Sequence, residues 1–196
     1  QIMVDFKYLA NGYGWVFTKK EYLSVGLGIL KFEKTDLKKI LANYLRELGI
    51  EVESGEFLLR AHPIPVYNDR PEFKRAKGRI LLAGDAAYLA DAFIGEGIYY
   101  ALASGFAAVN SIIESKNYKS VSENYQSQLE RNLFPELKAA ENTAKLFYNN
   151  KKIVKLLLKR REDLLISFMD VVQGLESYAE LGKLFNFLRN LFRIKI

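Results

Sequence analysis

The residues best placed to do chemistry lie in positions 79–98, where two glycine-bearing segments follow a short apolar run. Residues 79–83 are typical of a buried strand in a parallel sheet, and the run ends at Gly84 and Asp85. Ligands of open parallel sheets bind at this edge of the sheet. Gly84 would allow close approach to the backbone, and the ionised Asp85 could accept a hydrogen bond from a sugar-like hydroxyl.

A second break at Gly95, Glu96 and Gly97 precedes a helix rich in small residues, which we expect to end near residue 113. The glycines leave the first amides of that helix bare. These amides, with the positive end of the helix dipole, suit a phosphate or a group that gains negative charge during a reaction. The alternative is an ordinary strand and turn in which Asp85 serves only as a helix cap.

Two further elements precede this stretch. Residues 13–30 predict a β-hairpin, with Tyr13, Trp15 and Phe17 alternating with smaller residues. From residue 35 the apolar period becomes helical and ends at Gly49, which predicts an amphipathic helix. The three aromatic side chains either form a sheet face packed on that helix or contact a ligand.

Composition excludes several classes of site. The 196 residues include no cysteine and one histidine, which excludes disulfides, thiolate metal sites and iron–sulfur clusters and disfavours a Ser-His-Asp triad. We expect no metal site, and we assign no role to His62. No apolar run reaches the ~18 residues of a spanning helix, so we expect a cytoplasmic location. Because Gln1 opens directly on strand-like sequence, we expect the chain to be the back part of a longer protein.

The net charge of +6 is confined to the last third of the chain. Residues 1–114 hold 14 basic and 14 acidic side chains, whereas residues 115–196 hold 15 and 9. Residues 151–161 and 183–196 are basic with apolar faces, so they suit either packing on the rest of the enzyme or an anionic membrane surface.

Two motifs resemble those of one enzyme family. Residues 79–98 resemble the second FAD-binding motif of flavoproteins with the p-hydroxybenzoate hydroxylase fold. With Gly-Glu-Gly-Ile at residues 95–98, they are most similar to the geranylgeranyl reductase family. Residues 13–18, Tyr-Gly-Trp-Val-Phe-Thr, resemble that family's Tyr-x-Trp-x-Phe-Pro signature, which lines the isoprenoid-binding cavity. Both motifs have the order and rough spacing of the last half of such a protein.

The resemblance implies an α+β fragment of a p-hydroxybenzoate hydroxylase-like flavoprotein. Residues 1–75 would supply part of the antiparallel substrate-domain sheet with one helix. Residues 76–115 would supply the last strand and helix of the FAD domain, and residues 116–196 a helical C-terminal region. The N-terminal dinucleotide-binding part would be missing, since the glycines near residues 12–28 lack the Gly-x-Gly-x-x-Gly spacing. We therefore expect this chain alone to bind FAD weakly.

The resemblance also implies the reaction: an FAD-dependent oxidoreductase that reduces carbon–carbon double bonds of a polyprenyl lipid by hydride transfer from reduced flavin. Asp85 would bind a ribityl hydroxyl, and the Gly95–Gly97 segment would place helix amides near the N1/O2 edge of the flavin ring. The implied cofactor-binding residues are Gly84, Asp85, Ala86, Gly95, Glu96, Gly97 and Ile98. The implied substrate-binding residues are Tyr13, Trp15 and Phe17.

Three positions depart from the family pattern. Thr18 and Ala92 stand where the family usually has proline, and Tyr88 stands where it usually has glycine or histidine. No residue is an obvious proton donor, because the position of Glu96 alone does not make it a general acid. The catalytic residues and the electron donor therefore stay unassigned.

Two alternatives remain. The first is a flavin monooxygenase of the same fold, which would need polar anchors where this chain has aromatic residues. The second is a basic module in which residues 145–196 bind a membrane or nucleic acid. Under the reductase hypothesis we expect a polyprenyl lipid as substrate, peripheral membrane contact through the basic helices, and no nucleic acid.

Overall fold

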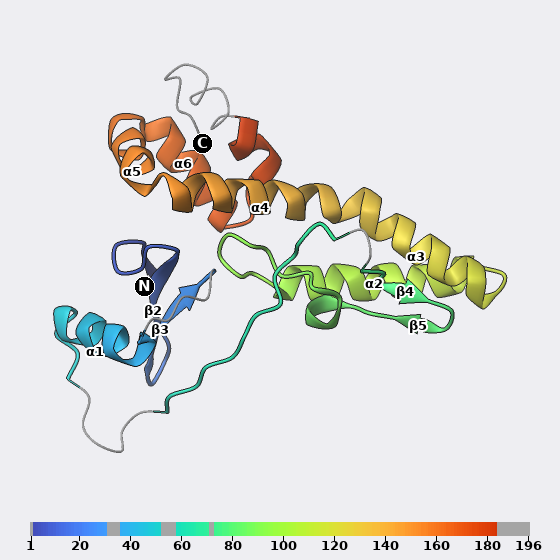
Figure 1. Cartoon of the computed structure of the whole chain (residues 1–196), viewed down its shortest axis with the longest axis horizontal. Coiled ribbons are helices and arrows are strands. Elements are labelled where there is room, and N and C mark those ends of the chain that lie inside the picture. The colour runs from blue at the N-terminus through green and yellow to red at the C-terminus, as the bar shows by residue number, and fades with distance from the viewer. Residues whose placement is uncertain (1, 31–35, 52–57, 71–72, 184–196) are drawn as a thin grey trace. The chain divides into compact units, whose positions relative to one another are not determined.

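The computed structural model describes residues 2–30, 36–51, 58–70 and 73–183, which form a mixture of helices and small sheets (Figure 1). The chain divides into two compact units, residues 1–63 and 64–196. The three-part division at residues 75 and 115 stays a prediction.

The first unit contains a three-stranded antiparallel sheet. Its strands β1 (Ile2–Asp5), β2 (Gly12–Thr18) and β3 (Leu23–Ile29) lie in that order, so the predicted hairpin is confirmed. In the β2–β3 register, Trp15 lies opposite Gly26 and Tyr13 lies opposite Gly28. Each of these two large aromatic residues of β2 is thus paired with a glycine of β3.

The helix α1 (Leu37–Glu47) covers one face of this sheet. The Asp36 carboxylate caps it by accepting a hydrogen bond from the Lys39 amide at 3.1 Å, and Gly49 follows its end with a positive φ of 68°. The fully buried Tyr44 contacts β2, where a Cβ atom at Gly14 would lie 2.9 Å from the Tyr44 ring. Because side chains alternate along a strand, the face that carries Gly14 is the face toward α1.

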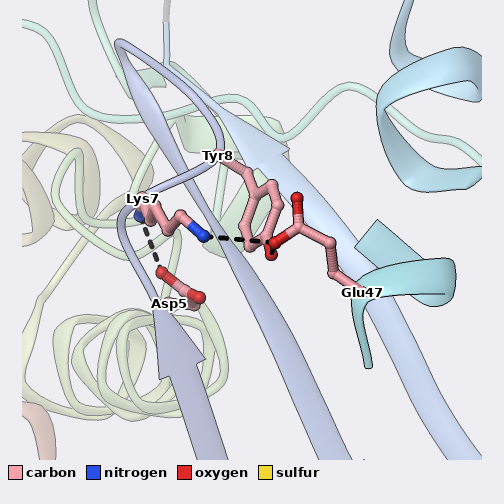
Figure 2. Close-up of polar contacts among 4 residues, drawn as sticks. All are labelled: Asp5, Lys7, Tyr8 and Glu47. Atoms are coloured by element: carbon pink, nitrogen blue, oxygen red, sulfur yellow. Dashed lines mark hydrogen bonds and ion pairs between the residues drawn. The ribbon is translucent and has the colours of Figure 1, made fainter. Parts of the chain in front are cut away.

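A polar cluster ties the end of α1 to the β1–β2 connection (Figure 2). The Glu47 carboxylate accepts hydrogen bonds from the Tyr8 hydroxyl and, at 3.1 Å, from the Lys7 ammonium. The Lys7 amide in turn donates to the Asp5 carboxylate at 2.7 Å. The Tyr8 hydroxyl, with the Lys7 ammonium, holds the pKa of Glu47 below its usual value.

The second unit begins with a short hairpin, β4 (Ala76–Lys77) and β5 (Ile80–Leu81), followed by a 3₁₀ turn, η1 (Gly84–Ala87). The expectation of a buried parallel strand over residues 79–83 is wrong. The pairing is antiparallel, covers two residues, and leaves Ile80 65% exposed. The physical reason is that, among the described residues, no parallel strand lies beside this apolar run.

Among the described residues of the second unit, most belong to the helices α2 (Ile98–Glu114), α3 (Tyr118–Asn132), α4 (Phe134–Asn149), α5 (Lys151–Arg160) and α6 (Glu162–Val172). The predicted extent of α2 is confirmed to within one residue, and α2 runs beside α3 (Figure 1). Asn117 caps α3 through its side chain, and α4 carries a proline in its first turn. None of the described helices is long and apolar enough to cross a membrane.

The core between these elements is apolar and aromatic. Buried side chains from η1, α2, α3 and α4 and from the segments beside them meet there: Tyr67, Ala87, Leu89, Tyr100, Tyr125, Leu129, Leu133 and Leu137. In contrast, one stripe of α2 stays exposed over the whole helix: Ile98, Leu102, Phe106, Val109 and Ile113 are each more than half exposed. This stripe is an apolar face that the described part of the chain leaves exposed.

Candidate functional site

The turn that bears Gly84 and Asp85 packs against the first turns of α2. Gly84 has a positive φ of 53°, and a Cβ atom there would lie 2.9 Å from the Cβ of Ala101. The Gly84 amide donates to the Ser104 hydroxyl at 3.0 Å, and the Tyr125 hydroxyl donates to the Leu82 carbonyl at 2.6 Å. Glycine is therefore required at position 84 by its backbone conformation and by its closeness to α2.

The two glycine-bearing segments meet. A Cβ atom at Gly97 would lie 3.4 Å from Oδ1 of Asp85 and 3.5 Å from the Cβ of Ala90. The hydrogen bond from the Asp91 amide to the Glu96 carbonyl, 2.8 Å long, closes the loop that returns the chain from η1 to the start of α2. The turn at Asp85 and the start of α2 at Gly97 therefore lie within contact distance of each other, and the role of these residues as a cofactor site stays a prediction.

Polar groups at this surface are available for a ligand. The Asp85 carboxylate is exposed and receives no hydrogen bond from the described part of the chain. Glu96 caps α2 by accepting from the Tyr99 amide at 2.8 Å. The amides of Gly97 and Ile98 find no acceptor among the described residues, so an external acceptor could bind there.

The remaining positions of the predicted set surround this surface. Ala86 is exposed beside Asp85, and Ile98 is 78% exposed at the start of α2. Gly95 has a positive φ of 72°, a conformation that glycine adopts without steric cost. Tyr88 also has a positive φ, of 54°, although it is not glycine. Its ring lies edge-on against Phe73 with centroids 5.2 Å apart, so this side chain gains a contact in exchange for backbone strain.

Sequence reasoning missed the residues that hold the site in place. Asp91 is buried and binds three amides of the 91–96 loop, while Ser104 and Tyr125 hold the Gly84 turn. Aspartate is common at the start of loops that contain glycine, so the position of Asp91 before Gly95 was one weak signal. Nothing in the local sequence indicates the distant partner Tyr125.

The aromatic face lies in the first unit. The rings of Tyr13, Trp15 and Phe17 form a row, with centroids 6.0 Å and 6.1 Å apart. A Cβ atom at Gly26 would lie 2.2 Å from the Trp15 ring, and one at Gly28 would lie 3.1 Å from the Tyr13 ring. The rings of Tyr13 and Trp15 therefore lie across β3 on glycines that leave room for them.

This row does not pack on α1. Since Gly14 faces Tyr44 of α1, the neighbouring positions Tyr13 and Trp15 face the opposite side of the sheet. All three rings of the row are half-buried, not fully buried. The interpretation of these aromatics as a core face packed on the helix is therefore wrong.

Known proteins resemble this chain over part of their length. An uncharacterized protein of Methanosarcina barkeri is 35% identical over 147 residues, 74% of this chain and 37% of that protein. The chloroplastic geranylgeranyl diphosphate reductase of rice, Oryza sativa, is 34% identical over 70% of this chain and 30% of the enzyme. The digeranylgeranylglycerophospholipid reductase of Methanocella arvoryzae is 36% identical over 54% of this chain and 27% of the enzyme.

The chain thus spans less than half the length of these curated relatives. No family model matches the chain, and no solved structure matches it.

Proposed function

The chain is a relative of the geranylgeranyl reductases over part of their length, and from this premise we propose the function of the protein that contains it. It is an FAD-dependent oxidoreductase that reduces carbon–carbon double bonds of a polyprenyl lipid. The relatives' names support a reductase that acts on prenyl compounds. The single observation that carries the cofactor assignment is the meeting of Asp85 with Gly97 at the start of α2.

The residues present are suited to hold FAD. Gly97 lacks a side chain where a Cβ atom would touch the Asp85 carboxylate, which keeps this surface open to a ligand. Asp85 would accept a hydrogen bond from a ribityl hydroxyl, and the Gly97 and Ile98 amides would face the edge of the ring that becomes negative on reduction. Gly84, Ala86, Gly95 and Glu96 shape the backbone around that edge.

FAD, when bound, supplies the hydride. The part of this chain is to orient the cofactor, to bind the substrate and to exclude water. Tyr13, Trp15 and Phe17 present a continuous apolar row on which a polyprenyl chain would lie, with loss of water from both surfaces as the driving force. The Glu96 carboxylate is engaged with the Tyr99 amide, so the proton donor is left unassigned.

The basic helix α5 is the proposed membrane contact. Lys152, Lys155 and Lys159 are exposed, and next to them Ile153 and Leu156 are 39% and 49% exposed. A helix that exposes both lysines and large aliphatic side chains suits an anionic lipid surface, where the alkyl groups enter the boundary and the ammonium groups reach the headgroups. A lipid substrate would explain why the enzyme contacts a membrane through α5. The second basic segment, residues 183–196, lies almost entirely outside the described residues.

The cofactor assignment is tested by Asp85→Ala in the full-length protein. The change removes a ligand acceptor and no core volume, so we expect FAD affinity to fall about tenfold with little loss of stability. Asp163→Ala, which removes an exposed carboxylate that pairs with Arg161, is the matched control and should leave affinity unchanged. An unchanged flavin dissociation constant in Asp85→Ala contradicts the assignment.

The substrate assignment is tested by Trp15→Ala. Because it interrupts the aromatic row, kcat/KM for long prenyl substrates should fall about tenfold or more while flavin content is retained. Tyr22→Ala is the control, since Tyr22 is 65% exposed at the β2–β3 turn and lies outside the row. Wild-type turnover of long prenyl substrates by Trp15→Ala would contradict the proposal.

Product analysis separates the proposal from its rivals. When the full-length protein is reduced anaerobically in the presence of candidate prenyl lipids, lipid analysis should show products in which carbon–carbon double bonds have become saturated. Oxygen consumption coupled to hydroxylation would instead establish a monooxygenase. Salt-sensitive nucleic-acid binding by a flavin-free full-length protein would establish a basic binding module.

A further inference from the structure

The C-terminal helices surround the loop that connects the two halves of the proposed flavin surface. Phe93, in the middle of that loop, is fully buried. Its ring contacts Phe147 and Tyr148 of α4, Phe168 of α6 and Tyr178 beyond α6, with centroid separations of 5.2, 5.8, 5.6 and 5.9 Å. The Tyr148 hydroxyl also donates to the Phe93 carbonyl at 2.9 Å. We call these four rings the Phe93 cage.

Asp91 organises the same loop from the inside. Its Oδ1 accepts hydrogen bonds from the Phe93 amide at 2.7 Å and the Ile94 amide at 2.9 Å, and its Oδ2 accepts from the Glu96 amide at 3.0 Å. The Tyr178 hydroxyl donates to Oδ1 at 3.3 Å. One carboxylate therefore fixes the path of the chain up to the residue before Gly97.

Asp91 is buried, so its charged carboxylate depends on each of these hydrogen bonds for stabilisation. The residue is 1% exposed, and among the described residues no ammonium or guanidinium group forms an ion pair with it. Burial raises its pKa, and the three amides act against that rise by stabilising the anion. A buried carboxylate held by amides and one hydroxyl cannot give up an acceptor oxygen without leaving a buried or partly buried amide unpaired.

We propose that Asp91 is a positioning residue for the flavin surface: with Tyr178 and the Phe93 cage, it couples the C-terminal helices to the amides at the start of α2. This inference rests on the proposed function for its effect on the cofactor. Its effect on the loop conformation depends only on residues of this chain and does not require a bound flavin. The helical C-terminal region is then part of the cofactor site and does more than cover it.

Asp91→Asn tests the effect on the loop. The amide side chain keeps one acceptor oxygen, which we expect to stay with the Phe93 and Ile94 amides, while its NH₂ group faces the Glu96 amide. Hydrogen exchange in the full-length protein should therefore quicken about tenfold or more at the Glu96 amide and much less at the other two. Val154→Ala, a truncation of a buried residue on α5, should give no such difference between the three amides.

The effect on the cofactor is measured on the same variants. Asp91→Asn should raise the flavin dissociation constant about tenfold and shift the visible absorption band of the bound flavin. Tyr178→Phe, which removes only the 3.3 Å hydrogen bond, should change the dissociation constant about twofold to threefold. Val154→Ala should leave both the band and the dissociation constant unchanged.

The outcomes separate this inference from the proposed function. If the wild-type protein binds no flavin, the proposed function is wrong, and the exchange pattern still decides whether Asp91 positions the loop. If flavin binds and Asp91→Asn shows wild-type exchange at Glu96, or a wild-type flavin spectrum and affinity, the positioning role is overturned.

Discussion

Replacing Gly84 with alanine perturbs the proposed cofactor surface at its most constrained point. The residue is buried at the start of η1 with a φ of 53°, where an L-residue is strained. A Cβ atom added there would also lie 2.9 Å from the Cβ and 3.3 Å from the Cα of Ala101. Since Ala101 belongs to α2, the conflict is relieved only by moving the helix or the turn.

The two costs can be estimated separately. The left-handed conformation costs alanine about 1–2 kcal/mol, and the overpacking costs about 1–3 kcal/mol. The loss of unfolded-chain entropy on changing glycine to alanine offsets about 0.4–1 kcal/mol. We therefore expect Gly84→Ala to lower the free energy of unfolding by about 1–5 kcal/mol.

A double-mutant cycle isolates the packing cost. Ala101→Gly removes the Cβ on the helix side and by itself should cost about 0.5–1 kcal/mol, because glycine is poorly suited to a helix. In that background Gly84→Ala should cost only about 1 kcal/mol, since the strained φ and the 3.3 Å approach to the Cα of residue 101 remain while the 2.9 Å contact with the Cβ is removed. Urea unfolding of the four proteins gives the coupling free energy, which we expect to be about 1–3 kcal/mol.

Gly105→Ala provides the control. Gly105 lies on the same helix, and a Cβ atom added there would have no neighbour within 4 Å, so alanine should stabilise the protein by about 0.5–1 kcal/mol. Equal effects of Gly84→Ala in both backgrounds would show that the turn does not contact α2, and the close approach of the two halves of the site would be refuted.

Two other predictions concern the first unit. Gly26→Ala should displace the Trp15 indole, because the new Cβ would lie 2.2 Å from the ring. Trp15 is the sole tryptophan of the sequence, so a shift in tryptophan fluorescence reports the change directly, and an unshifted spectrum would contradict the contact. Glu47→Gln should destabilise the unit above pH 4.5 and progressively less below it. The Tyr8 hydroxyl and the Lys7 ammonium lower the pKa of Glu47, so its contribution is lost as the pH falls through that lowered value. Unfolding measured against pH checks this, and a difference that grows on acidification would oppose it.

Local patterns in the sequence predicted the local elements well. The alternation of aromatic and small residues in β2, the period of α1 and the glycine at its end each act over a few neighbouring residues, and the structure confirms them. The two breaks at Gly84 and Gly95 were found in the same way, because glycine marks positive φ or close approach. In contrast, the strand expected at residues 79–83 depended on a parallel partner that the local pattern cannot supply.

For a similar reason, the sequence could not predict which face of the sheet carries the aromatic row. Alternation places Tyr13 and Trp15 on one face of β2, but it does not say which face meets α1. The contact of Tyr44 with Gly14 settles that, and the glycines opposite the rings show why the row fits its own side. Both facts join residues that are far apart in the chain.

The sequence by itself determined which residues are chemically capable: a carboxylate at the end of an apolar run, glycines that precede a helix, and aromatic residues that alternate along a strand. These follow from residue type and spacing. Only the tertiary structure decided that Asp85 lies against the start of α2, and that Asp91 is held by Tyr178, 87 residues away. Long-range contacts depend on how several elements pack at once, and no short window of residues carries that information.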